Sequence, residues 1–156
     1  MIDIEALLDL STYETAIRVA RRKNSEDNTN EFFTPYSIVK KMCDKIPDSD
    51  WANPEKTFLE PSFGNGQFLL YIIYNRINHN IDWKTALNTL YGVELMQDNV
   101  DEAKERILNL LDKMEISYDK EETISIMNHN LVCSDFFKWD FENWRPISEP
   151  SSVSLF

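Results

Sequence analysis

Glycine, cysteine and positive charge are all scarce in this sequence of 156 residues. With 16 Lys and Arg against 27 Asp and Glu, the formal net charge is −11, which argues against tight binding of a phosphate backbone by this chain alone. The two cysteines, Cys43 and Cys133, form no CxxC spacing, and this favours a reduced, intracellular protein.

Membrane and export signals are also lacking. No apolar run approaches the ~20 residues that a membrane span requires. The N-terminal segment MIDIEALLDL is acidic, whereas a signal peptide would be basic there. We therefore expect a cytoplasmic protein that makes no contact with a membrane.

The sequence does contain alternating helical and extended patterns, over a length that suits one domain with a real core. Apolar periodicity predicts helices over residues 4–22, 35–46, 67–78, 82–90 and 97–114, with part of 115–130 also helical. Short apolar runs predict strands at 57–60, 90–95 and 130–135. We expect an α/β fold with a partial, mostly parallel sheet and helices on both faces. An N-terminal helix and polar linker (1–30) would precede this domain (31–156).

The second of these helices has a clear expected start and buried side. Thr34 is a good N-cap residue, and Pro35 suits the first turn of a helix. A single apolar stripe would face the core from this helix: Ile38, Val39, Met42 and Ile46.

Each expected strand ends in a carboxylate, namely Glu60, Glu94 and Asp135. In open α/β sheets, ligands bind beyond the carboxyl ends of the strands, so these acids would line one crevice. An acid after a strand is often only a turn former or a helix cap. Three of them together, with a glycine loop after the first strand, favour a shared site.

The glycine loop follows the first strand in the stretch TFLEPSFGNGQFL, which holds Gly64 and Gly66. Glycines after a strand permit a tight turn and bring backbone N–H groups close to a ligand, although a turn with no ligand is the alternative. Leu69 stands where the dinucleotide fingerprint needs a small residue, and no Gly-Lys-Ser/Thr of a P-loop is present. The loop therefore favours a nucleoside ligand without a pyrophosphate.

Residues beyond the other two strands point to adenosine. Glu94 can accept hydrogen bonds from both ribose hydroxyls, and Leu95 can flank a purine. Asp135 can accept from an exocyclic amine, and Phe136 or Phe137 can stack on the base, although either ring can instead be core. A glycine turn, a ribose acceptor and a base-edge acceptor together describe an adenosine pocket.

Four segments, in this order, resemble the cofactor half of the N6-adenine DNA methyltransferases of restriction–modification systems and phages: FFTPYSIVKKM, FLEPSFGNGQFL, YGVEL and CSDFFKWD. The resemblance covers about Phe32 to Asp140. It implies a doubly wound, Rossmann-like methyltransferase fold and S-adenosylmethionine as the cofactor.

The resemblance also implies roles for individual residues. The segment expected to fold over the methionine part of the cofactor is Phe33, Thr34 and Pro35. The residues that match the glycine-rich loop are Glu60, Pro61, Gly64 and Gly66. Glu94, followed by Leu95, matches the ribose-binding acid. Asp135 matches the acid that contacts the adenine amine, with Phe136 as its stacking neighbour.

The catalytic signature of that family, Asp/Asn-Pro-Pro-Tyr/Phe at the end of a fourth strand, is absent from the sequence. In the family it orients the amino group of a flipped base toward the methyl donor. We therefore expect a cofactor-binding half that is not catalytic alone, and that meets DNA only through a separate catalytic or recognition part.

Without a fourth strand, the strand carrying Phe58 and Leu59 becomes an exposed apolar edge. We expect either a partner chain or the tail residues Val153, Leu155 and Phe156 to cover it.

Other readings stay open on the sequence alone. A stand-alone module that binds S-adenosylmethionine and regulates a partner, a non-functional remnant, and methylation of RNA or protein all share the same cofactor site. A metal site is not expected, because His79 and His129 lack acid or Cys partners at ligand spacing. A basic cluster in the first helix is most simply a solvated helix end: Arg18, Arg21, Arg22 and Lys23.

Overall fold

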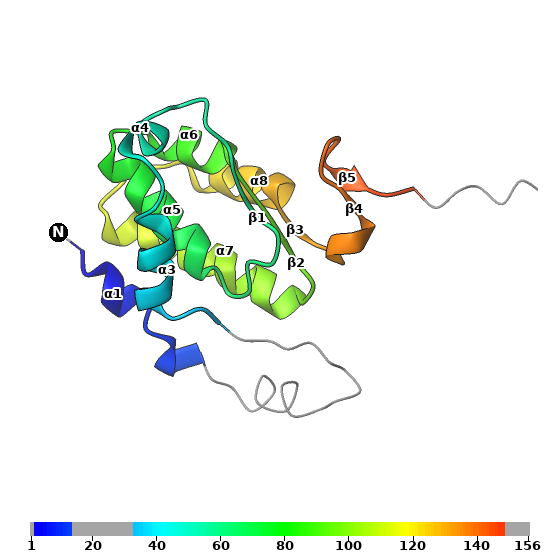
Figure 1. Ribbon diagram of the computed structural model, residues 1–156, viewed down its shortest axis with the longest axis horizontal. Helices are drawn as coiled ribbons and strands as arrows, with labels where there is room; N and C mark the ends of the chain where they lie inside the picture. The colour runs from blue at the N-terminus through cyan, green and yellow to red at the C-terminus, as the bar shows by residue number, and fades with distance from the viewer. Residues whose placement is uncertain (1, 14–32, 149–156) are drawn as a thin grey trace, which may run out of the picture.

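The computed structural model describes residues 2–13 and 33–148 and shows a mixed α/β fold (Figure 1). Its elements, in chain order, are α1 (Ile4–Leu7), η1 (Leu10–Tyr13), α3 (Tyr36–Cys43), α4 (Asp48–Trp51), β1 (Phe58–Glu60), α5 (Gln67–Asn78), α6 (Trp83–Asn88), β2 (Leu90–Glu94), α7 (Gln97–Lys113), α8 (Lys120–Asn130), β3 (Leu131–Cys133), η2 (Phe136–Lys138), β4 (Trp139–Asp140) and β5 (Arg145–Pro146). No helix among these residues is both long and apolar enough to cross a membrane.

The expected strands form a three-stranded sheet in the order β1-β2-β3. Both neighbouring pairs are parallel; Phe58 stands opposite Leu90, and Glu94 stands opposite Cys133. The prediction of a parallel sheet is therefore confirmed for this part of the chain. Within the described residues β1 is an edge strand, because only β2 pairs with it.

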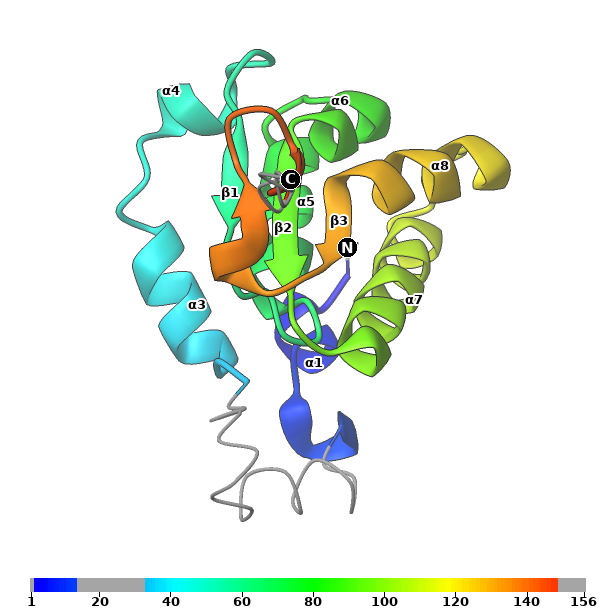
Figure 2. The ribbon, with the colours of Figure 1, turned by 90° about the vertical axis from the view of Figure 1, so that its right-hand side faces the viewer.

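The helices gather on one side of this sheet. Figures 1 and 2 show α3, α5, α6 and α7 on one side, and the β4–β5 hairpin on the other. The connections from β1 to β2 and from β2 to β3 both step along the sheet in the same direction. Because crossover connections between parallel strands are right-handed, the helices of both connections lie on the same face. Among the described residues, the expectation of helices on both faces is thus corrected: the β4–β5 hairpin, and no helix, covers part of the second face.

Side chains on the two faces differ accordingly. The register places Phe58, Leu90 and Leu131 on one face, where Leu90 and Leu131 are buried beneath the helices. On the opposite face Leu59 is 51% exposed, as expected for the apolar edge strand, and Tyr91 is partly buried.

An aromatic cluster in the hairpin covers part of this second face. The Trp144 ring lies 4.9 Å from the Tyr91 ring and 5.3 Å from the Trp139 ring, between ring centroids. Its indole Nε1 donates to the carbonyl of His129 at 2.8 Å, which ties the hairpin to α8. The tail residues that the sequence suggested as a cover for the edge of β1, namely Val153, Leu155 and Phe156, lie outside the described residues.

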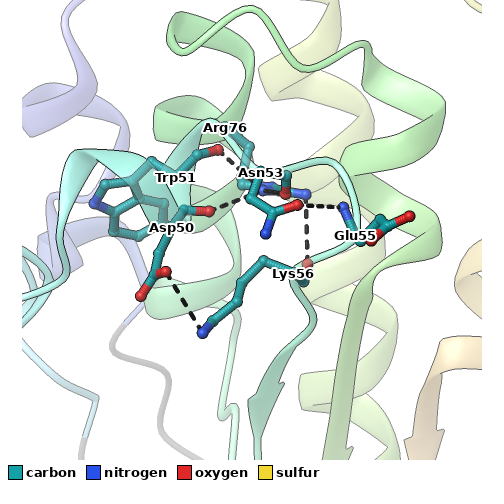
Figure 3. Close-up of polar contacts among 6 residues, drawn as sticks. All are labelled: Asp50, Trp51, Asn53, Glu55, Lys56 and Arg76. Atoms are coloured by element: carbon teal, nitrogen blue, oxygen red, sulfur yellow. Dashed lines mark hydrogen bonds and ion pairs between the residues drawn. The ribbon is translucent and has the colours of Figure 1, made fainter.

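The far end of α5 carries a buried guanidinium. Arg76 donates to the carbonyl oxygens of Trp51 (2.9 Å) and Asn53 (2.6 Å), at and just after the end of α4 (Figure 3). Its guanidinium carbon lies 5.2 Å from the ring centroid of Phe58. The segment PDSDWANPEK, where the sequence analysis expects no helix or strand, holds the short helix α4 and the buried Trp51.

The first helix is shorter than its periodicity predicted. It ends at Leu7, and the separate 3-10 turn η1 follows. The Asp9 side chain accepts from the N–H of Ser11 at 2.9 Å, a local bond that competes with the helical ladder. The rest of that expected helix, the linker and the basic cluster at residues 18–23 fall outside the described residues.

Two expectations for the second helix are also corrected. Pro35, not Thr34, is the N-cap residue of α3, and no side chain caps this helix. Val39 and Cys43 form its buried side, while Ile38 and Met42 are 45% and 54% exposed. The other helix boundaries follow the sequence more closely, as at α6, where Asp82 accepts from the Thr85 N–H at 3.0 Å.

Candidate functional site

A small cavity of about 80 Å³ lies beside the carboxyl end of β1, where the sequence placed the ligand. Its lining is built from the segment before α3, the end of β1, the glycine loop and the first turn of α5: Phe33, Thr34, Glu60, Ser62, Phe63, Gly64, Asn65, Gln67 and Phe68. The fold thus brings together four residues proposed from the sequence, namely Phe33, Thr34, Glu60 and Gly64.

The two glycines of the loop adopt left-handed conformations that favour glycine. Gly64 has φ of +55° and Gly66, the residue before α5, has φ of +99°. A Cβ at Gly64 would lie 3.1 Å from the Phe33 ring. A Cβ at Gly66 would lie 3.1 Å from Cβ of Ala103 on α7. The loop therefore turns tightly and packs closely against Phe33 and α7.

Asn65, between these glycines, is a polar side chain without a hydrogen-bond partner in the described structure. It is 0% exposed, and neither its Oδ1 nor its Nδ2 has a hydrogen-bond partner. Leaving an amide unsatisfied in the interior costs free energy, so a ligand able to bond it would be favoured. The sequence analysis did not single out Asn65, although its place between two loop glycines was a usable signal.

Glu60 ends β1 and is partly buried against the cavity. One of its carboxylate oxygens accepts from the N–H of Ser62 at 3.1 Å. Burial raises the pKa of the Glu60 carboxyl, and the nearby negative charge of Glu94 adds to the increase, against the opposing effect of the Ser62 bond. A cation beside Glu60 would favour its ionised form.

Glu94 ends β2, is only 6% exposed and accepts from Asn99 Nδ2 at 2.9 Å. Asn99 lies in the first turn of α7, so the acid is held between its strand and the following helix. Two residues earlier, a Cβ at Gly92 would lie 2.6 Å from Cδ1 of Phe63. Gly92 therefore leaves room for the Phe63 ring, a packing role that the sequence analysis did not predict.

The remaining residues proposed from the sequence lie outside the cavity lining. Asp135 caps η2, because its Oδ1 accepts from the Phe137 N–H at 2.9 Å. The Phe136 side chain is 44% exposed, and its ring centroid lies 4.9 Å from that of Phe141. Leu95 is 54% exposed. Pro35, the cap of α3, and Pro61, after β1, are also exposed.

The described residues contain no group of three or more His, Cys, Asp or Glu side chains placed to hold a metal ion. His79 instead lies at the end of α5, where its Nδ1 is 2.7 Å from the carbonyl oxygen of Asn75 and its Nε2 is 3.4 Å from Asp48.

Comparison with known proteins finds no matching family model, no matching curated protein and no matching solved structure. A functional assignment therefore rests on the residues of this chain and on the motifs that they form.

Proposed function

We propose that this chain is the S-adenosylmethionine-binding part of a site-specific N6-adenine DNA methyltransferase, with a Rossmann-like methyltransferase fold. The observation that carries the proposal is the joint placement of Glu60, Glu94 and the Gly64–Gly66 loop at the carboxyl edge of one parallel sheet. This is the edge at which sheets of this kind bind nucleotides. The proposal places the protein in the cytoplasm, with its cofactor and DNA.

The cavity residues fit one end of the cofactor. S-adenosylmethionine has an ammonium, a carboxylate and a sulfonium, and it has no phosphate. Glu60 offers a negative charge for the cationic groups, and Asn65 offers an amide that none of the described residues bonds. Because ligand pockets usually measure about 300–1,000 Å³, a cavity of about 80 Å³ suits the amino-acid end alone.

Glu94 is the proposed acceptor for the ribose hydroxyls. Its carboxylate already accepts from Asn99, so ribose binding would share or exchange this hydrogen bond. The exposed Leu95 beside it would flank the purine. Asp135 and Phe136 complete the proposal as the adenine-binding pair. Asp135 would accept from the adenine amine either in addition to the Phe137 N–H or in its place.

Catalysis is proposed to need a further part. The sequence has no Asp/Asn-Pro-Pro-Tyr/Phe motif to orient a target amino group. The open edge of β1, with Leu59 half-exposed beside it, supports a partner that adds a strand there. The second candidate is a regulatory module that binds the cofactor without transferring its methyl group. The absence of the same catalytic motif favours it.

Calorimetric titration with S-adenosylmethionine tests the cofactor site. The wild type should bind, and Glu94→Ala should weaken binding by several kcal/mol, at about 1.5–3 kcal/mol for each lost hydrogen bond to a charged acceptor. Glu105→Ala, which removes an exposed acid of α7, should bind as the wild type does. Equal affinity of the wild type and Glu94→Ala would remove Glu94 from the site.

A methyl-transfer assay tests the second half of the proposal. With unmodified DNA and labelled S-adenosylmethionine, this chain alone should transfer no methyl groups. Robust turnover would show that catalysis does not need a further part.

A further inference from the structure

Gln67, the first residue of α5, joins three parts of the molecule through one buried amide. Its Nε2 donates to the carbonyl oxygens of Leu8 and Thr34, both at 2.9 Å. Its Oε1 accepts from Arg106 Nη2 at 2.8 Å. Two carbonyls on one side and a guanidinium on the other fix the orientation of the amide, because only the nitrogen can donate and only the oxygen can accept.

Arg106 extends this connection from α7 to the glycine loop. Its Nη1 donates to the carbonyl oxygen of Asn65 at 2.9 Å, and its Nη2 also donates to that of Leu7 at 2.8 Å. The carbonyls of Leu7 and Leu8 end α1, where no further helical turn provides donors. Gln67 and Arg106 therefore satisfy the end of α1 and attach it to the loop.

The same bonds hold two walls of the candidate cavity. Thr34 belongs to the wall before α3, and Asn65 belongs to the glycine loop. Each is bonded through its backbone carbonyl, so the spacing of the walls depends on Gln67, which itself lines the cavity, and on Arg106, which lies behind the lining. Gln67 and Arg106 are 3% and 5% exposed, which shields these bonds from competition by water.

We propose that Gln67 and Arg106 are positioning residues, which lock the segment 2–8 and the segment 33–34 to the glycine loop and thereby set affinity for the amino-acid end of the ligand. The ligand part of this inference rests on the proposed function. The locking part concerns the protein alone and is tested without a ligand.

The first test is hydrogen exchange followed by mass spectrometry on the full chain carrying Gln67→Met. Exchange should become roughly tenfold faster in peptides covering residues 2–8 and 62–66, because about 1.4 kcal/mol of local stabilisation is lost. The control is Arg76→Met, which removes a buried donor to carbonyls at the other end of α5 and should accelerate exchange more around residues 48–56 than at 62–66. Unchanged exchange at 62–66 in a folded Gln67→Met protein would overturn the proposal.

The second test compares two ligands. S-adenosylmethionine has the amino-acid end, whereas 5′-methylthioadenosine keeps the nucleoside and sulfur but lacks that end. Gln67→Met should weaken binding of the first roughly tenfold and leave the second within about twofold. Equal weakening of both would show a general structural role and would contradict positioning at that end.

Two further outcomes keep the inferences separate. If the wild type binds neither ligand, the proposed function fails, while hydrogen exchange still decides whether the segments are locked. If Gln67→Met does not fold, Arg106→Lys replaces it, because one ammonium keeps the charge but cannot reproduce the fork that spans Asn65, Leu7 and Gln67. The same pattern of exchange is expected, and normal exchange at 62–66 would overturn the proposal.

Discussion

Glu60 and Glu94 end neighbouring parallel strands, and the charge of Glu94 adds to the effect of burial in raising the pKa of the Glu60 carboxyl. Glu60 stands opposite Gly92, two residues before Glu94, so both acids project from the same face of the sheet. A position beside two neighbouring carboxylates stabilises a cation.

The raised pKa of Glu60 predicts a pH dependence of folding. An acid whose pKa is higher in the folded than in the unfolded state gives stability that is fully present below the unfolded pKa. That stability is lost as pH rises through the folded pKa. Glu60→Gln should therefore gain in melting temperature over the wild type at pH 7, and the gain should shrink as pH falls through the raised pKa of Glu60 toward the ordinary carboxyl value. Thermal unfolding between pH 4 and 8 measures this difference.

The control is Glu55→Gln, which removes an exposed acid in the loop before β1. It should follow the wild type closely across the same range. A pH-independent difference between Glu60→Gln and the wild type would contradict a raised pKa at Glu60.

Gly92→Ala should destabilise the protein by steric overlap. The new methyl group would meet the buried Phe63 ring, because the ideal Cβ lies 2.6 Å from its Cδ1. Overpacking of this kind costs about 1–3 kcal/mol, measurable by denaturant unfolding. Phe63→Leu in the same chain should recover part of this loss, and a double mutant whose effects simply add would show that the two residues are not coupled.

Arg76→Met should destabilise the fold by about 3 kcal/mol in denaturant unfolding, because the carbonyls at the end of α4 lose their buried donor. Burial lowers the pKa of Arg76, yet the carbonyl bonds and the Phe58 ring hold it in place. Arg145→Met, at a 71% exposed side chain, should change stability by less than about 0.5 kcal/mol. Similar effects of the two substitutions would contradict the role assigned to Arg76.

Trp144→Ala should uncover the second face of the sheet. The Trp144 ring packs on Tyr91 and is tied to His129, so its removal should cost about 2 kcal/mol and increase binding of a hydrophobic dye. Phe137→Ala removes an aromatic ring that is 84% exposed. It should leave both the stability and the dye binding near those of the wild type. Unchanged dye binding in Trp144→Ala would show that the hairpin does not cover this face.

The sequence predicted the three strands of the parallel sheet and most helices because their signals are local, whereas it did not predict the β4–β5 hairpin. The apolar period and the caps place α5 and α6 almost to the residue, as Asp82 shows at the start of α6. It could not show which side of a helix has neighbours. Ile38 and Met42 complete an apolar stripe in sequence, but α3 lies at the margin of the molecule and its fully buried residues are Val39 and Cys43.

The candidate site was predictable where its residues directly follow strands. It was less predictable where side chains bond backbone carbonyls that are distant in the sequence. Phe33, Thr34, Glu60 and Gly64 meet at the cavity as proposed. Gln67 and Arg106 were missed, because their partners Leu8 and Thr34 lie 59 and 33 residues from Gln67 in the chain. Tertiary hydrogen bonds between residues so far apart leave no periodic signal in a single sequence.

The central claim, that the carboxyl edge of this sheet binds S-adenosylmethionine, is tested most directly by NMR titration of the labelled chain. The account predicts that added S-adenosylmethionine shifts the backbone amide signals of residues 62–66 and 94–95 and leaves those of residues 48–56, around Arg76, unchanged. A titration in which the signals of 62–66 and 94–95 do not move would contradict it.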